Sequence, residues 1–313
     1  MKPRKSLKKR EQRTESRPAH ISMIIYAVAV IFFILVAAYF IFPSNSDIWN
    51  VSSDGILSYP ENRGKVDVAL LKTESGSKYT LETISFPSKD YIVEGLFRIP
   101  SSGKKVPGVV ILPGATVSKE GTQTLAEILS GMGYASLGLE QRNQGGVDMD
   151  YDLKLFSKGR EPIEHMMVFD ALRAVDVLRQ DPRIDAKKIA VIGESNGGRF
   201  AILAAALDRD IRGVIGISTS GYDIESQSVN IRNETILRFY RSIDPDTYLK
   251  SIPPRRFVMI HSVNDSIIPI DLAENTFRKA KEPKKFYNVT TGTHGFSGGM
   301  KEPLEIEMRL MFQ

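Results

Sequence analysis

The sequence predicts an α/β domain with a mostly parallel sheet, opened by antiparallel strands, covered by helices on both faces and preceded by one transmembrane helix. Three observations lead to this fold class. An uncharged run of 22 residues lies near the N-terminus, short alternating runs follow from residue 65, and uniformly apolar runs then alternate with helical segments. Strands that are apolar throughout are typical of a parallel sheet buried on both faces.

Charge and composition exclude several classes of protein. The 313 residues, 42% of them hydrophobic, are enough for a sizeable core. The net charge of +5 belongs to the N-terminal tail, because residues 1–20 contain eight Lys or Arg and two Glu while the remainder is almost neutral. A nucleic-acid partner is therefore not expected. The absence of cysteine excludes disulfides and thiolate nucleophiles.

The first 64 residues divide into a predicted cytoplasmic tail (1–20), a transmembrane anchor (21–42) and a linker (43–64). The anchor carries no charge and, as a helix rising ~1.5 Å per residue, spans about 33 Å, enough for a hydrocarbon core of roughly 30 Å. A cleaved signal peptide is the alternative, but its apolar region is usually only ~7 to 15 residues long. The basic tail predicts a cytoplasmic N-terminus and an extracytoplasmic domain. Ser, Asn, Asp and Gly in the third segment indicate a linker.

Residues 65–313 form the predicted globular domain. Period-2 alternation and turn signals predict opening antiparallel strands at 66–72, 78–86 and 91–99. Apolar runs predict buried parallel strands at 106–112, 135–139, 189–192, 214–218, 257–261 and 286–289. Helical segments are expected at 122–132, 162–179, 197–207, 272–281 and 303–312. Residues 220–255 interrupt this alternation, are partly helical at 234–241, and are interpreted as a candidate cap insertion.

A serine lies in a tight turn between an apolar run and a helical run. The pattern Gly-Glu-Ser-Asn-Gly has Ser195 at its centre, with Gly193 and Gly197 two residues to either side. Side chains at these two glycines would collide with the neighbouring strand or helix of a nucleophile elbow. A second match, centred on Ser297, is followed by no helix and has no Asp or His downstream. Ser195 is therefore the predicted nucleophile.

A serine hydroxyl needs a base that removes its proton as it attacks. The chain has four histidines: His20, His165, His261 and His294. The first lies in the tail, the second inside a helical run, and the third ends a buried strand, where a structural hydrogen bond is expected. His294 lies in a loop after the last predicted strand and is the predicted base.

The imidazole in turn needs a carboxylate that fixes its tautomer. Asp265 follows the penultimate strand and precedes His294, which gives the order Ser, Asp, His of this architecture. Asp271 is the nearby rival, but its place suits the cap of the helix expected from residue 272. Asp223 and Glu225 remain further alternatives.

An oxyanion hole completes the predicted site. One N–H is expected from Asn196, which follows the nucleophile, and the other from Ala115, in the Pro-Gly-Ala-Thr loop after strand 106–112. The alternative, that Pro-Gly is only a turn, stays open. Glu194 has two interpretations: it forms an ion pair with Arg142 or Arg199, or it lines the pocket and disfavours anionic substrates.

Four stretches carry a family resemblance: Gly-Glu-Ser-Asn-Gly-Gly at 193–198, Asp-Pro-Arg-Ile-Asp at 181–185, His-x-x-x-Asp-x-x-x-Pro at 261–269 and His-Gly-Phe at 294–296. They resemble the α/β-hydrolase superfamily, most of all the branch of prolyl-oligopeptidase catalytic domains and dienelactone-hydrolase-like esterases. The resemblance covers about residues 66–313 and implies the fold and a Ser-His-Asp triad. The loop reads Leu-Pro-Gly where many relatives have His-Gly, and the gating propeller of the oligopeptidases is not present in this sequence.

The sequence thus predicts a membrane-anchored serine hydrolase that cleaves a carboxylic ester through an acyl-enzyme. The expected substrate is a small-molecule ester or a short peptide, and no metal or cofactor is expected. Three alternatives remain. A peptidase of the prolyl-oligopeptidase type and an acyltransferase would use the same residues, and a non-catalytic tethered binding domain would keep only the fold.

Overall fold

The computed structural model describes residues 48–313. The predicted tail, the predicted anchor and residues 43–47 of the predicted linker lie outside the described residues. Within 48–313, no helix has both the length and the apolar composition needed to cross a bilayer.

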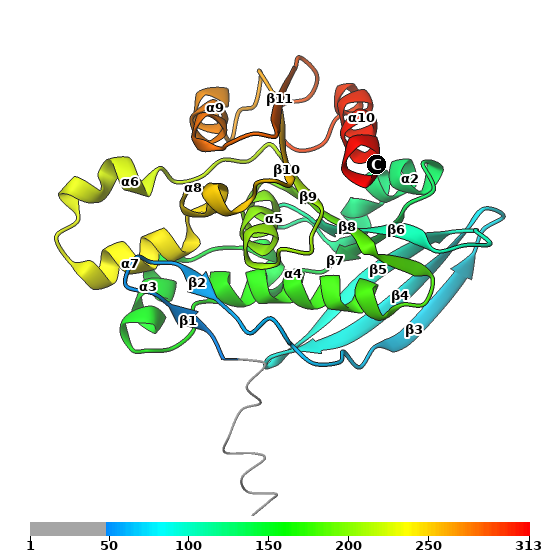
Figure 1. Cartoon of the computed structure of the whole chain (residues 1–313), viewed down its shortest axis with the longest axis horizontal. Coiled ribbons are helices and arrows are strands. Elements are labelled where there is room, and N and C mark those ends of the chain that lie inside the picture. The colour runs from blue at the N-terminus through cyan, green and yellow to red at the C-terminus, as the bar shows by residue number, and fades with distance from the viewer. Residues whose placement is uncertain (1–47) are drawn as a thin grey trace, which may run out of the picture. The chain divides into compact units, whose positions relative to one another are not determined.

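One nine-stranded sheet runs through the domain, in the order β11-β10-β9-β8-β6-β7-β5-β4-β3 (Figure 1). The strands are β3 (Ala69–Ser75), β4 (Tyr79–Ser88), β5 (Tyr91–Pro100), β6 (Val106–Leu112), β7 (Ala135–Leu139), β8 (Ile184–Glu194), β9 (Gly213–Ile217), β10 (Arg256–Ser262) and β11 (Lys284–Val289). Strands β3, β4, β5 and β7 pair antiparallel, and β7, β6, β8, β9, β10 and β11 pair parallel. The predicted mostly parallel sheet with antiparallel opening strands is confirmed.

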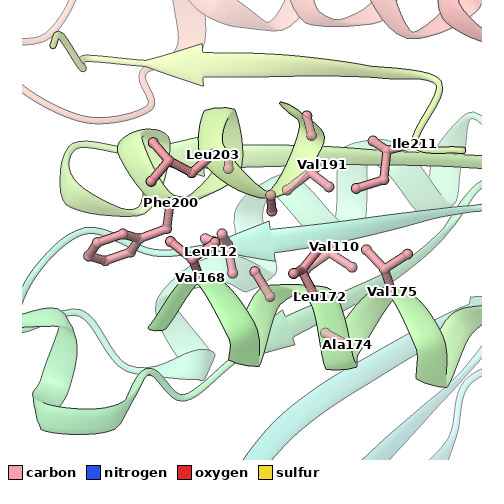
Figure 2. Packing of buried hydrophobic residues seen from close by; sticks show 14 of the residues in the cluster. Val110, Leu112, Val168, Leu172, Ala174, Val175, Val191, Phe200, Leu203 and Ile211 are labelled. Atoms are coloured by element: carbon pink, nitrogen blue, oxygen red, sulfur yellow. The ribbon is translucent and has the colours of Figure 1, made fainter. Parts of the chain in front are cut away.

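Helices cover both faces of this sheet. They are α2 (Gln123–Gly131), α3 (Met149–Ser157), α4 (Ile163–Gln180), α5 (Asn196–Leu207), α9 (Ile270–Lys279) and α10 (Lys301–Phe312). One buried apolar cluster joins the sheet to α4 and α5, and a second joins its other face to α2 and α10. Figure 2 shows the first cluster, with Val110 and Leu112 of the sheet between Leu172 of α4 and Phe200 of α5.

The apolar runs have a simple physical cause. Within β6, Val110 and Leu112 belong to the first cluster, while Val109 and Ile111 belong to the second. Successive side chains of a strand point to opposite faces, so a strand covered on both faces must be apolar at every position. Each fully buried side chain of this size contributes roughly 1.5–3 kcal/mol, so polar residues are not tolerated there.

The segment expected to be a linker is largely folded onto the domain. Residues 48–64 include a small antiparallel pair, β1 (Asn50–Val51) and β2 (Leu57–Ser58). The Trp49 ring lies 6.1 Å from that of Phe156, and the Leu57 N–H donates to Tyr248 Oη at 2.8 Å. Arg63 is 6% exposed and binds aspartates at the C-terminal half of α4 and the end of α5. A composition rich in turn residues is compatible with a tight hairpin as well as with a linker. Here the tertiary contacts give a hairpin that packs on the domain.

Residues 220–255 form a packed, mainly helical insertion. It contains α6 (Ile224–Gln227), α7 (Glu234–Ile243) and α8 (Pro245–Tyr248). Phe239 of α7 is fully buried, with its ring 5.6 Å from Phe156 of α3. Asp244 accepts hydrogen bonds from the N–H groups of Tyr222 and Ile224, both at 2.9 Å. The Phe239–Phe156 contact attaches the insertion to the body of the domain, and the Asp244 bonds brace the insertion internally.

Candidate active site

Ser195 lies at a strained turn where β8 ends and α5 begins. Its backbone has φ 51° and ψ −120°, which few residues other than glycine adopt. A Cβ atom at Gly193 would lie 2.1 Å from the carbonyl oxygen of Gly197, and one at Gly197 would lie 2.3 Å from that of Leu112. The Ser195 N–H donates to the carbonyl of Ile217 in β9 at 2.9 Å, and the residue is only partly buried. The structure therefore holds a serine in the geometry of a nucleophile elbow.

His294 and Asp265 form a direct pair beyond the ends of β11 and β10. Nδ1 of His294 lies 2.9 and 3.0 Å from the two carboxylate oxygens of Asp265. The Asp265 side chain is fully buried, whereas that of His294 is 26% exposed. The N–H groups of Ile267 and Ile268 also donate to Asp265 Oδ1.

The environment of Asp265 favours its ionised form. Burial alone would raise the pKa of this carboxyl. The two backbone N–H groups, together with hydrogen bonds from His294 and Ser218, outweigh burial and hold the pKa below its ordinary value. A carboxylate thus faces the imidazole at neutral pH, as a residue that orients a catalytic histidine must.

The loop after β6 passes directly beside Ser195. A Cβ atom at Gly114 would lie 3.3 Å from the Cβ of Ser195, so a glycine permits this close approach. The next residue, Ala115, is partly buried, and its N–H donates no hydrogen bond within residues 48–313. Asn196 is the first residue of α5, where N–H groups have no intrahelical acceptor. The Asn196 N–H thus directly follows the serine, and the Ala115 N–H lies in the loop that passes beside it.

A side-chain network, which sequence reasoning missed, supports these two N–H groups. Arg199 Nη2 donates to Asn196 Oδ1 at 2.7 Å, and Asn196 Nδ2 donates to the Gly145 carbonyl at 3.1 Å. A Cβ atom at Gly145 would lie 3.2 Å from the Cα of Ala115, so this loop packs against the predicted oxyanion loop. The available signal was the Gln-Gly-Gly run after β7, where positive φ values occur.

Glu194 has a different partner from those expected. Arg142 forms a fork with Asp170, at 2.6 and 2.9 Å, and Arg199 binds Asn196. The predicted ion pair of Glu194 with either arginine is therefore wrong. Glu194 Oε2 instead accepts the N–H of Phe296 at 2.7 Å.

The remaining histidines and the second serine motif lie in structural roles. His165 is fully buried, with Nε2 2.7 Å from Ser242 Oγ, and burial followed by the charge of Lys89 lowers its pKa to about 3. His261 Nε2 lies 2.8 Å from the Ile268 carbonyl, the structural bond that was expected. Ser297 has ordinary extended backbone, φ −135°, unlike a nucleophile elbow. A 3-10 turn (Gly298–Met300) follows it and leads directly into α10, so the expectation that no helix follows this serine is wrong.

The rival acids lie away from His294. Asp271 is exposed in the first turn of α9, a helix that begins one residue before it rather than one after. Asp223 pairs with Lys279 at 2.5 Å, and Glu225 pairs with Arg241. Among residues 48–313, no group of three or more His, Cys, Asp or Glu side chains is placed to hold a metal ion.

The acetyl xylan esterase (AXE1) family matches residues 71–246, more than half of the chain. The chain belongs to the acetyl xylan esterase family. The matched range contains Ser195, Asn196 and Ala115, and it ends before Asp265 and His294. This membership confirms the expected resemblance to the α/β-hydrolase superfamily.

The chain is also similar to individual curated proteins. The uncharacterised protein YfhR of Escherichia coli is 27% identical over 162 residues, which are 50% of this chain and 55% of YfhR. The chain thus spans about half the length of the curated relatives that it matches.

Two solved structures share the fold. An acetyl xylan esterase from Paenibacillus sp. R4 has a TM-score of 0.67 and 18% identity, covering 80% of this chain and 90% of that one. A glucuronoyl esterase from Solibacter usitatus has a TM-score of 0.62 and 15% identity, covering 86% and 90%. At such identities the likeness establishes the α/β-hydrolase fold. Both proteins are esterases by name, which is the broad enzyme class predicted for this chain.

Proposed function

We propose that this chain is a serine esterase and that it removes small acyl groups, acetyl above all, from hydroxyl groups of carbohydrates. The observation that supports the proposal most strongly is the hydrogen bond from Phe296 to Glu194. It joins the residue before the strained serine to the loop that begins at His294, itself paired with Asp265. This link supports the assignment of Ser195 as nucleophile, His294 as base and Asp265 as orienting carboxylate at the carboxyl ends of the parallel strands, where this class of sheet carries its sites. The acetyl preference rests on family membership.

The proposed mechanism uses only residues of this chain. Ser195 Oγ attacks the ester carbonyl while His294 takes its proton, and Asp265 stabilises the imidazolium that forms. The N–H groups of Asn196 and Ala115 bind the oxyanion. His294 then gives the proton to the departing alcohol oxygen, which leaves Ser195 acylated. Water, deprotonated by the same histidine, releases the carboxylic acid and restores the serine.

We further propose that residues 21–42 anchor the enzyme, with the N-terminus in the cytoplasm and residues 43–313 outside. The support is the uncharged 22-residue run behind a tail of eight basic residues. Full-length protein carrying an N-terminal tag is expected in the carbonate-resistant membrane fraction, with its tag protected from protease added to intact cells. Recovery in the carbonate supernatant, or digestion of the tag, would contradict the topology.

The activity is tested with full-length protein in detergent micelles, with Ser195→Ala as control. We expect acetate release from acetylated xylo-oligosaccharides and from short acyl esters, falling as the acyl chain lengthens, and none from the control. Cleavage of aminoacyl amides with comparable efficiency would indicate a peptidase. Transfer to an added alcohol that outpaces hydrolysis would indicate an acyltransferase. If a fluorophosphonate fails to label Ser195, the chain is a non-catalytic binding domain.

A further inference from the structure

Two consecutive backbone N–H groups directly after His294 are held by side chains from other strands. The Gly295 N–H donates to Ser218 Oγ at 3.0 Å, and the Phe296 N–H donates to Glu194 Oε2 at 2.7 Å. Glu194 is the last residue of β8, and Ser218 directly follows β9. The loop that carries the proposed base is thus tied to β8, which ends next to the strained serine, and to the end of the neighbouring strand β9.

Glu194 has no part in the mechanism derived above, yet it lies next to the nucleophile. Burial raises its pKa, while the Phe296 N–H and the charge of His294 lower it. Desolvating a carboxylate costs several kcal/mol at most sites, so packing alone does not account for a glutamate here. The loop also fits closely around it, because a Cβ atom at Gly295 would lie 3.0 Å from Glu194 Oε2.

Ser218 connects the same loop to the other member of the histidine pair. It is fully buried and has a φ of 46°, a strained value for a residue with a side chain. Its hydroxyl accepts the Gly295 N–H and also hydrogen-bonds to Asp265, whose pKa it helps to lower. One hydroxyl therefore fixes the acid and the loop of the base with respect to each other.

We propose that Glu194 and Ser218 are positioning residues that clamp the loop 294–296 and keep the His294 ring in register with Ser195 during proton transfer. The proposal deepens the proposed esterase function and rests on it. Other bonds hold the residues just before this point, from Ser262 Oγ to the Gly292 carbonyl and from the Ser266 N–H to the Thr293 carbonyl. The two N–H groups after His294 are held by Ser218 and Glu194. A displacement of ~1 Å in a catalytic group lowers rates by about 100-fold. The clamp thus acts on catalysis through His294 without touching substrate.

The test compares Glu194→Ala, Glu194→Gln and Ser218→Ala in full-length enzyme, with active sites titrated. We expect kcat to fall about 30-fold in Glu194→Ala and Ser218→Ala, with KM changed less than about threefold. Glu194→Gln keeps an oxygen that accepts the Phe296 N–H, so it is expected to recover most of kcat. The double alanine variant is expected to lose less than the product of the two single losses, because the two residues hold one loop.

The controls are Glu307→Gln and Ser242→Ala, which alter a buried carboxylate and a buried hydroxyl whose hydrogen-bond partners lie outside the loop 294–296. They are expected to lower Tm and leave kcat per active site unchanged. If Glu194→Ala and Ser218→Ala behave like these controls, or raise KM at unchanged kcat, the clamp proposal is overturned.

A second readout separates the clamp from the choice of substrate. The rate of fluorophosphonate labelling of Ser195 depends on activation by His294 but on no particular ester. We expect this rate to fall in parallel with kcat in the alanine variants. If the wild-type enzyme is labelled rapidly but hydrolyses no ester, the esterase proposal is wrong. The clamp proposal is then judged by comparing the labelling rates of the wild type and the alanine variants. A wild-type enzyme that does not label would remove both.

Discussion

Replacing Asp265 with Asn is predicted to abolish most of the activity while leaving the fold intact. The N–H groups of Ile267 and Ile268 both donate to Oδ1, so the amide oxygen of the asparagine must take that place. The NH₂ group then occupies the Oδ2 position, 3.0 Å from His294 Nδ1, and donates to it, while the amide oxygen, 2.9 Å from the same nitrogen, is already engaged by the two N–H groups. That bond selects the imidazole tautomer with its proton on Nε2, which cannot accept the proton of Ser195.

The loss of the correct tautomer is expected to lower kcat by about 10³- to 10⁴-fold, equivalent to about 4 to 5.4 kcal/mol of transition-state stabilisation. The assay is acetate release by full-length enzyme at neutral pH. Asp271→Asn is the matched control, because Asp271 is exposed in the first turn of α9 and is expected to keep full activity. An Asp265→Asn enzyme within tenfold of wild type, or an inactive control, would refute the assignment.

Three further predictions concern the elbow, the oxyanion network and a buried histidine. Gly197→Ala is expected to destabilise the domain by about 3 kcal/mol or more in urea unfolding, because its Cβ would meet a carbonyl oxygen at 2.3 Å; an unchanged midpoint would contradict the elbow geometry. Arg199→Met is expected to lower kcat about tenfold at constant KM, because Asn196 loses its bond; an effect on KM alone would contradict this. His165 has a pKa lowered to about 3 by burial and then by Lys89, so the unfolded chain binds a proton that the folded chain does not. Above pH ~6.5 this histidine is neutral in both states and does not lower the free energy of unfolding. Between pH ~6.5 and ~3 it lowers the free energy of unfolding by about 1.4 kcal/mol per pH unit. The wild type should therefore lose stability over this range more steeply than His165→Phe, and parallel profiles would contradict the assignment.

The regular elements that pack on both faces of the sheet were predictable. Strands β6 and β7 occupy the predicted ranges, because continuous apolar runs have only one place in this architecture. Helix α3 was missed because a nine-residue helix with aspartates in its first turn has a weak apolar period and is fixed by its Asp148 cap and by contacts with α7. The segment 48–64 was interpreted as a linker because its local composition is typical of one. The residues on which it packs, such as Tyr248, lie far away in the chain and leave no local signal.

In the candidate site, too, some residues were predictable from local sequence and others were not. The predicted Ser195, His294 and Asp265 carry recognisable local patterns, and the structure places His294 and Asp265 in direct contact. The Glu194–Phe296 bond joins residues 102 positions apart and has no local signature. Because glutamate next to the serine is compatible with many partners, only the folded chain identifies its acceptor role.

The central claim is that Ser195 carries the acyl group during ester hydrolysis. The most direct measurement is peptide mass analysis of full-length enzyme quenched during turnover of an acetyl ester, beside Ser195→Ala. We expect one added acetyl group on the peptide containing Ser195, which disappears as substrate is exhausted and never forms in the variant. Acetate release without acylation of Ser195, or full turnover by Ser195→Ala, would contradict it.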